Sequence, residues 1–170
     1  MQNKIVLVTG GFDPIHSGHI AYFKEAKQLG DQLIVGVNSD EWLQRKKGRA
    51  FMTQHERMLI ISELACVDAA YRFDDTDGSA CSFILDMRRQ YPDAQLIFAN
   101  GGDRTADNIP EMSITDSNLE FVFSVGGENK LNSSSDILTR WKVDKVDRVW
   151  GHYNVLDEVP GAKIKTLYVM

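Results

Sequence analysis

A ten-residue segment near the start of the chain constrains its fold more than any other feature. The segment Gly10–His19 reads GGFDPIHSGH and follows directly on an apolar run, Ile5–Val8. A short apolar run that ends in glycines is typical of a buried strand, and the residues after it are typical of a tight turn that leads into a helix. The pattern therefore predicts a strand, a turn and a helix N-terminus in immediate succession.

The predicted turn and helix N-terminus together indicate a phosphate site. Gly10 and Gly11 lack a Cβ atom, so the chain can turn sharply and bring its amides close to a ligand. The first turn of a helix has unpaired N–H groups and the positive end of the helix dipole, which attract phosphate. His16 and His19 are three residues apart and lie on the same side of that turn, and Gly18 leaves the approach between them open. We therefore expect both imidazoles to donate hydrogen bonds to one polyphosphate.

A simpler alternative is that either imidazole only caps the helix. For a single histidine this alternative is favoured, because short motif matches often arise by chance. The two imidazoles, the two glycines and the preceding strand in combination favour the polyphosphate site instead.

Length and composition exclude several classes of protein. A chain of 170 residues is typical of one domain with a core of ordinary size. Its formal net charge of −5 predicts no general attraction to nucleic acid or to an anionic membrane. The apolar run near the N-terminus is too short for a signal peptide, and no run approaches the length of a membrane span. We therefore expect a cytoplasmic protein with no nucleic-acid or membrane partner.

The two cysteines, Cys66 and Cys81, do not have the spacing of metal ligands. Both lie in segments that otherwise resemble buried helix. We interpret them as reduced core thiols, and we expect no metal-ligating residues in the chain.

Apolar runs alternate with helical patterns along the chain. The expected strands lie at residues 5–8, 32–38, 68–73, 95–99 and 119–125, and the expected helices at 17–29, 53–64 and around 83–91. Strands separated by helices predict crossover connections and a parallel sheet that is covered on both faces. We therefore expect an α/β, Rossmann-like fold of about five strands, with ligands bound at the carboxyl ends of the strands.

The sequence pattern changes near Trp141. The stretch that follows, residues 142–147, is polar and alternating, and the pattern beyond it is typical of strands. We therefore expect a main domain at residues 1–141, followed at residues 142–170 by a linker and a short C-terminal β extension.

Four cations lie within five residues at Arg45–Arg49. A solvated basic loop is the usual interpretation of such a run, but the expected fold places this one after the second strand, beside the phosphate site. Transfer of a phosphoryl group needs additional positive charge because negative charge accumulates in the transition state. We therefore expect Lys46, or the adjacent Lys47, to contact a phosphate.

The segment His16–His19, preceded by Gly11-Phe12-Asp13, resembles the HxGH signature of the cytidylyltransferase-like nucleotidyltransferase superfamily. The resemblance extends from about Lys4 to Trp141. It is strongest to heptose-1-phosphate adenylyltransferases and glycerol-3-phosphate cytidylyltransferases.

The resemblance implies a role for each matching residue. The residues implied in catalysis are His16, His19 and Lys46. Those implied in nucleotide binding are Gly10, Gly11, Phe12, Asp13, Gly18, Asp103, Ser133, Ser134 and Ser135. Those implied in binding the acceptor are Lys47, Arg49 and Arg57.

Two of these assignments have simpler alternatives. Ser133–Ser135 resembles the segment that opens the last helix of the superfamily, where hydroxyls and amides either bind phosphate or only cap the helix. Asp103 ends an Asn-Gly-Gly-Asp turn. In sugar-phosphate members of the superfamily this turn lies beside the nucleoside, and a turn that contacts no ligand is an equally good interpretation.

The resemblance also implies a reaction. A nucleoside triphosphate, ATP or CTP with Mg²⁺, would transfer AMP or CMP to a phosphorylated small acceptor, most readily a sugar 1-phosphate, in a homodimeric enzyme. The alternatives are a glycerol-3-phosphate type of cytidylyltransferase and a nucleotide-binding regulatory module without turnover.

The C-terminal segment has a resemblance of its own. Residues 147–156 and 160–165 resemble the opening of the cupin domain of type II mannose-6-phosphate isomerases. An incidental β-hairpin is the alternative. We interpret the segment as a partial cupin-like unit of a protein that acts in sugar-phosphate metabolism.

Overall fold

The computed structural model describes residues 2–102, 104–126 and 133–143. Its strands are β1 (Lys4–Gly10), β2 (Gln32–Val37), β3 (Ala69–Arg72), β4 (Gln95–Gly101) and β5 (Leu119–Val125). Its helices are α1 (Ser17–Lys27), α2 (Asp40–Lys47), α3 (Gln54–Ser62), α4 (Cys81–Gln90) and α5 (Ser134–Val143), with a 3-10 turn, η1, at Pro110–Ser113. The predicted strands are confirmed to within a few residues.

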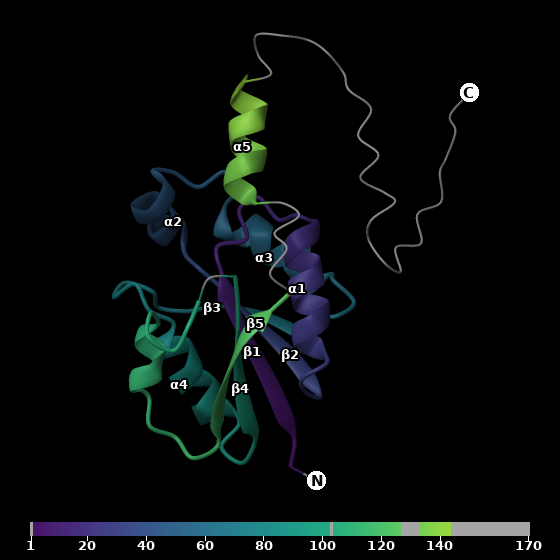
Figure 1. The fold of residues 1–170 in the computed structure, drawn as a ribbon, viewed down its shortest axis with the longest axis vertical. Helices are drawn as coiled ribbons and strands as arrows, with labels where there is room; N and C mark the ends of the chain where they lie inside the picture. Colours follow the sequence, from purple (N-terminus) through teal and green to yellow (C-terminus); the bar gives the residue numbers. More distant parts are fainter. Residues whose placement is uncertain (1, 103, 127–132, 144–170) are drawn as a thin grey trace, which may run out of the picture.

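The five strands form one parallel sheet in the order β3-β2-β1-β4-β5 (Figure 1). Strand β1 is central, and in it Leu7 lies opposite Ile34 of β2 and Phe98 of β4. The chain first builds outward from β1 to β3 and then crosses back to add β4 and β5. The order of the strands therefore reverses between β1 and β4, and a crevice for ligands is expected at the carboxyl ends of these two strands.

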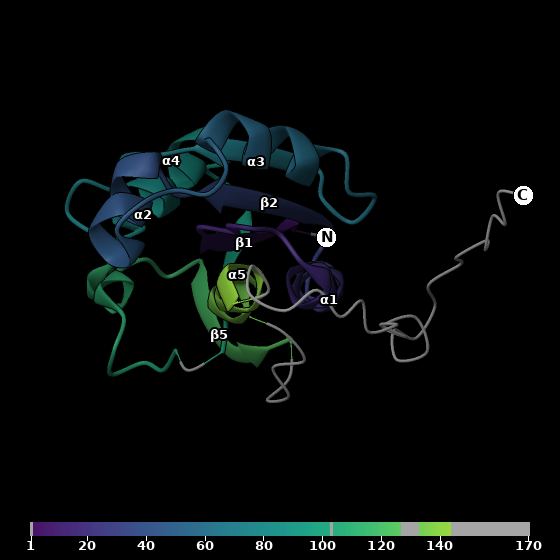
Figure 2. The same ribbon diagram turned by 90° about the horizontal axis from the view of Figure 1, so that it is seen from above.

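Alternate residues of β1 face the two sides of the sheet and are buried on both. Val6 and Val8 belong to a core cluster with residues of α1 and α3, whereas Ile5 and Leu7 belong to a second cluster with Phe83 of α4. Helices thus cover both faces, as Figure 2 shows from above. The predicted α/β, Rossmann-like fold is confirmed.

Helix α2 differs from the expected basic loop. Ser39 caps its N-terminus by accepting a hydrogen bond from the Trp42 amide, and Gly48, with φ of +84°, ends it in the left-handed conformation that glycine adopts without strain. The cations Arg45, Lys46 and Lys47 form its last turn. Positive side chains are stabilised there by the negative end of the helix dipole, so the cationic run is a helix terminus.

Helix α5 stands over the carboxyl ends of the strands in Figure 1. It continues to Val143, two residues beyond the expected domain boundary at Trp141. The predicted C-terminal β extension falls on residues 144–170, outside the described residues. Within the described part of the chain, the helices are too short or too polar to span a lipid bilayer.

Candidate active site

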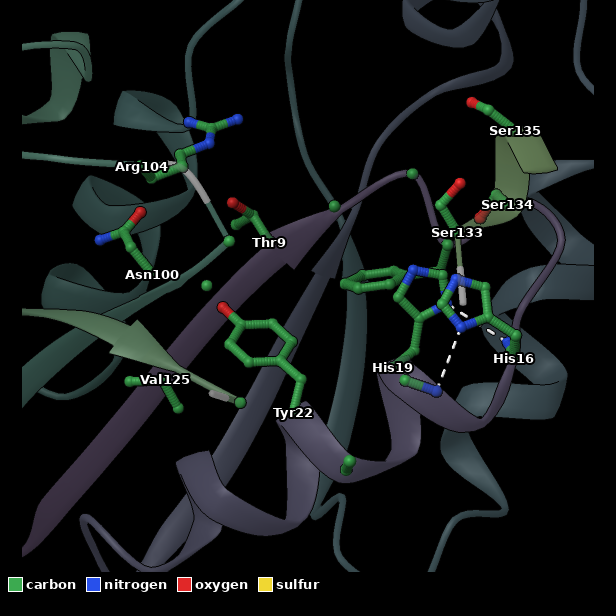
Figure 3. A pocket seen from close by; sticks show the side chains of 18 of the residues that line it. Thr9, His16, His19, Tyr22, Asn100, Arg104, Val125, Ser133, Ser134 and Ser135 are labelled. Atoms are coloured by element: carbon green, nitrogen blue, oxygen red, sulfur yellow. Dashed lines mark hydrogen bonds between the residues drawn. The ribbon is translucent and has the colours of Figure 1, made fainter. Parts of the chain in front are cut away.

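A cavity of about 440 Å³ opens at the carboxyl ends of β1 and β4. Figure 3 shows side chains that line it, contributed by β1, α1, the turn after β4, β5 and the start of α5. Of the predicted site residues, the cavity brings together Gly10, Gly11, Phe12, His16, Gly18, His19, Lys46, Lys47, Ser133, Ser134 and Ser135. Residues 120 positions apart in the sequence therefore meet at the switch point of the sheet.

The rings of His16 and His19 are stacked, with their centroids 3.8 Å apart. The Nδ1 atom of His16 accepts a hydrogen bond from the Gly18 amide at 3.1 Å, and that of His19 accepts one from the His16 amide at 3.3 Å. Both histidines therefore cap helix α1, and the two alternatives raised by the sequence are compatible. Because Nδ1 is an acceptor, a neutral ring carries its proton on Nε2, which leaves each ring one N–H donor for a ligand.

Both rings are held in the neutral form. Burial, the neighbouring His16 and Lys47 together lower the pKa of His19 to about 3. Burial, followed by the charge of Lys47, also lowers the pKa of His16. Near neutral pH the pair therefore offers two Nε2–H donors to the cavity and carries no positive charge.

Positive charge enters the cavity from Lys46 and Lys47 of α2 and from Arg104, which follows β4. The Lys47 ammonium donates a hydrogen bond to the Asp13 carbonyl at 3.2 Å, and burial lowers its pKa. The Lys46 ammonium lies 4.5 Å from the centre of the Trp42 ring, a cation–π distance. Cations and the N-termini of α1 and α5 thus surround a space suited to a polyphosphate.

A model of the cytidylyltransferase-like family matches residues 7–140 of the chain. The chain belongs to this family. The membership expected from the HxGH segment is therefore confirmed.

The cytidylyltransferase-like chain is similar to curated proteins named bifunctional protein HldE. It is 33% identical over 147 residues to the one from Syntrophotalea carbinolica, which covers 83% of this chain and 28% of that protein. It is 31% identical over 140 residues to the one from Geobacter sulfurreducens, covering 79% of this chain and 27% of that protein. The chain thus spans less than a third of the length of these relatives.

Two solved structures have a similar fold. A lipopolysaccharide core biosynthesis protein from Thermoplasma volcanium matches with a TM-score of 0.55 and 28% identity, covering 72% of this chain and 96% of that one. A protein of unknown function from Archaeoglobus fulgidus matches with a TM-score of 0.52 and 14% identity, covering 75% and 93%. The second similarity supports the fold alone.

The lowered pKa of His19 predicts how stability of this cytidylyltransferase-like chain depends on pH. Between pH 6.5 and about 3 the unfolded chain binds a proton at this ring that the folded protein does not, so the free energy of unfolding falls as the pH falls through this window. In His19→Gln, we expect the loss of stability between pH 7 and pH 4.5 to be smaller by about 1 kcal/mol or more. Urea unfolding at the two pH values measures it. The exposed His55 of α3, changed to Gln, is the control, and equal pH dependence in His19→Gln and wild type would contradict the prediction.

Phe12 forms the apolar floor beneath the histidines. Its ring is buried and meets His19 and Phe23 edge-on at centroid distances of 5.1 and 5.0 Å. Its φ of +50° is unusual for a residue with a side chain and costs of the order of 1 kcal/mol or more. The contact of Phe12 with a nucleotide remains a prediction, whereas its support of His19 is visible.

Asp13 does not line the cavity. Its carboxylate is buried and accepts hydrogen bonds from the amides of Phe51 and Met52 at 2.6 and 2.8 Å. The side chain therefore fastens the chain between α2 and α3 to the loop that joins β1 to α1, residues 11–16, which we call the phosphate loop. This placement differs from the nucleotide contact predicted for it.

Arg57 is also placed differently from its prediction as an acceptor contact. Its side chain is fully buried, and it donates hydrogen bonds to the carbonyls of Gly11, Asn38 and Met52 and to the carboxylate of Asp40. The guanidinium thus ties the ends of β1 and β2 to helix α3.

Two other predicted residues are not brought to the cavity. Arg49 is exposed and is not among the residues that line the cavity. Asp103 lies outside the described residues.

The three predicted serines occupy the start of α5 at the mouth of the cavity (Figure 3). Ser133 accepts a hydrogen bond from the Asp136 amide at 3.0 Å and therefore caps the helix. Ser134 is buried and donates to the Pro14 carbonyl at 3.0 Å, which joins α5 to the phosphate loop. Capping is thus observed, and phosphate binding by these residues remains a prediction.

Sequence reasoning missed Tyr22 and Arg104. The Tyr22 hydroxyl donates to the Ala99 carbonyl at 2.6 Å, and burial raises its pKa. A Cβ atom on Gly101 would lie 2.9 Å from the Val125 carbonyl oxygen and 3.1 Å from the Tyr22 ring, so this glycine is required by packing. Arg104 follows the predicted turn directly, and its position after a strand end was the available signal.

Mg²⁺, which the resemblance implies, does not find a set of protein ligands here. Among the described residues no group of three or more His, Cys, Asp or Glu side chains is placed to hold a metal ion. The described lining of the cavity also contains no carboxylate. The described residues therefore fit a metal ion only as part of a metal–triphosphate substrate, whose phosphates supply the ligands.

Proposed function

We propose that the chain is a nucleotidyltransferase that transfers AMP or CMP from a nucleoside triphosphate to a phosphorylated small molecule. The observation that carries this proposal is the stacked pair His16 and His19, whose Nδ1 atoms are engaged by the backbone and whose Nε2 donors remain for a ligand. The cavity around the pair is large enough for a ligand and is lined by cations.

The chemistry proceeds without a protein nucleophile. An oxygen of the acceptor phosphate forms a bond to the α-phosphorus, the bond from the α-phosphorus to the bridging oxygen breaks, and that oxygen leaves with pyrophosphate. The acceptor phosphate is already ionised at neutral pH, so the step needs no general base. The residues contribute by positioning and by stabilising charge: the histidine Nε2–H donors, Lys46 and the amides of the phosphate loop contact the transferring phosphates.

We propose a sugar 1-phosphate as the acceptor class. Two similarities support it: the sequence resemblance to heptose-1-phosphate adenylyltransferases and the likeness to a lipopolysaccharide core biosynthesis protein. The same resemblance favours ATP as the triphosphate and a homodimer as the active form. The corresponding location is the cytoplasm, where the enzyme is soluble.

Pyrophosphate release tests the proposal. The purified chain is incubated with ATP or CTP, Mg²⁺ and a panel of acceptors that contains hexose and heptose 1-phosphates and glycerol 3-phosphate. We expect release that depends on both substrates, with a sugar 1-phosphate as the better acceptor. A preference for glycerol 3-phosphate and CTP would favour the glycerol type, and nucleotide binding without release would favour the regulatory module.

A further inference from the structure

Helix α2 carries Lys46 and Lys47 to the cavity, yet few apolar contacts hold it in place. Figure 1 shows it at the edge of the molecule, above the carboxyl ends of the strands. All eight residues of α2 are described, and Leu43 is the only buried one among them. A helix of this length is marginal by itself in water, so its position depends on polar contacts with the rest of the fold.

The polar contacts of α2 converge on Asp75, which lies in the loop after β3. The Asp75 side chain is 3% exposed. It accepts hydrogen bonds from the Asn38 side-chain amide at 2.9 Å, the Ser39 backbone amide at 2.7 Å and the Ser39 hydroxyl at 2.7 Å. These donors belong to the two residues that directly precede α2. A carboxylate, which only accepts, matches such a set of convergent donors.

Asp75 orients the cap at the N-terminus of α2. The Ser39 hydroxyl donates its proton to the Asp75 carboxylate, which leaves its lone pairs for the Trp42 amide, from which it accepts at 3.0 Å. This second hydrogen bond is the N-cap of the helix. The geometry of the cap therefore depends on a residue 36 positions further along the chain.

The same residue holds the last turn of α2. The Arg45 Nη2 atom donates to the Asp75 backbone carbonyl at 2.8 Å and lies 3.9 Å from its carboxylate. The Arg45 side chain is half exposed, so the ion pair contributes little, whereas the hydrogen bond fixes the turn that also contains Lys46 and Lys47. Both ends of the helix are thus attached to Asp75.

The placement of α2 sets the distance between its cations and the phosphate loop. A Cβ atom on Gly11 would lie 2.7 Å from the Leu43 Cδ2 atom, so the helix packs directly on this loop. The Lys47 ammonium donates to the carbonyl of Asp13, in the same loop. A displacement of about 1 Å in a positioning element can lower turnover by about 100-fold, so a change in the attachment of α2 should be measurable in function.

We propose that Asp75 is a positioning residue, which holds both ends of α2 and thereby places Lys46 and Lys47 against the phosphates of the bound nucleotide. Asp75 is not among the residues that line the cavity, so it acts through the helix and not on the substrate. The inference rests on the proposed function, because it assumes that these lysines contact phosphate.

The test compares Asp75→Ala with wild type and with a matched control, Asp68→Ala. Asp68 also accepts from a backbone amide of β2, that of Leu33, and from the Lys27 ammonium, but at the opposite ends of the strands. We expect both variants to have a lower Tm. At a temperature well below Tm, Asp75→Ala should raise the Kd of ATP or CTP with Mg²⁺, measured by calorimetry, by about tenfold. It should lower kcat/KM for pyrophosphate release by at least as much, and Asp68→Ala should match wild type in both.

A second comparison separates positioning from a general loss of stability. If Asp75 acts through the two lysines, adding Asp75→Ala to the variant Lys46→Ala/Lys47→Ala should leave the Kd of the triphosphate unchanged. A further tenfold loss in this background would contradict the proposal.

Two milder variants keep the proposal testable if Asp75→Ala does not fold. Asp75→Asn retains an oxygen that can accept from Asn38 and from the Ser39 amide, so we expect it to recover most of the affinity. Ser39→Ala removes the cap that Asp75 orients, and we expect a smaller rise in Kd that also disappears in the background without the two lysines. A Ser39→Ala variant with the Kd of wild type would contradict the coupling through the cap.

The outcomes separate this inference from the proposed function. An unchanged Kd in Asp75→Ala, or an equal rise in Asp75→Ala and Asp68→Ala, overturns the positioning role while the proposed function stands. If wild type binds the triphosphate but releases no pyrophosphate with any acceptor, the proposed function fails, and the comparisons of Kd still decide the role of Asp75. If wild type binds no triphosphate, both proposals are overturned.

Discussion

Replacing His19 with alanine is expected to lower turnover by about 100-fold or more, the magnitude found when one donor to a transition-state oxyanion is removed. The His19 ring presents its Nε2–H to the cavity because Nδ1 accepts the His16 amide. Alanine removes the donor and leaves the His16 amide without its partner at the helix N-terminus. Steady-state pyrophosphate release at saturating substrates measures the effect.

Two conservative variants separate the donor from the cap. The amide nitrogen of glutamine reaches the position of Nε2, and the amide of asparagine reaches only the position of Nδ1. We therefore expect His19→Gln to retain more activity than His19→Asn, although each of the two variants lacks the His19 ring. His55→Ala, on the exposed side of α3, is the control and should have wild-type turnover. Activity within a few-fold of wild type in His19→Ala would exclude a contact with the transferring phosphate.

Replacing Arg57 with alanine is expected to destabilise the fold by about 3 to 5 kcal/mol, because three backbone carbonyls lose their donor at about 1 to 3 kcal/mol each. The guanidinium is fully buried and donates to three backbone carbonyls and to Asp40. Its removal leaves those carbonyls unpaired in a space that also contains the Asp40 carboxylate. For a chain of this size the loss corresponds to a decrease in Tm of roughly 10 °C, which thermal or urea unfolding would detect.

A milder variant keeps this prediction testable if Arg57→Ala does not fold. Arg57→Lys retains a cation within reach of Asp40 and loses the fixed fork of donors, so an intermediate loss of stability is expected. Arg89→Ala is the matched control because its pair with Asp86 is exposed, and it should change stability by about 0.5 kcal/mol or less. If Arg57→Lys were as stable as wild type but had a raised KM for the acceptor, the acceptor contact predicted from the sequence would be correct instead.

The strand, the phosphate turn and the first helix were predictable because the interactions that form them are local. The apolar run of β1, the glycines after it and the caps of α1 involve residues only a few positions apart. The same is true of the helix that Thr53 caps, where its side chain accepts from the Glu56 amide at 3.3 Å. The alternation of such units was sufficient to predict a parallel sheet and the edge at which the cavity opens.

The positions of Asp13 and Arg57 are decided by packing between distant segments. The sequence alone does not distinguish a charged side chain that faces a ligand from one that faces a buried carbonyl. Arg57 faces the carbonyls of Gly11 and Asn38, 46 and 19 positions away, because α3 packs beneath the ends of β1 and β2. Local patterns thus determine the elements and the phosphate loop, whereas burial, which depends on how the elements pack, determines which charges remain available to a substrate.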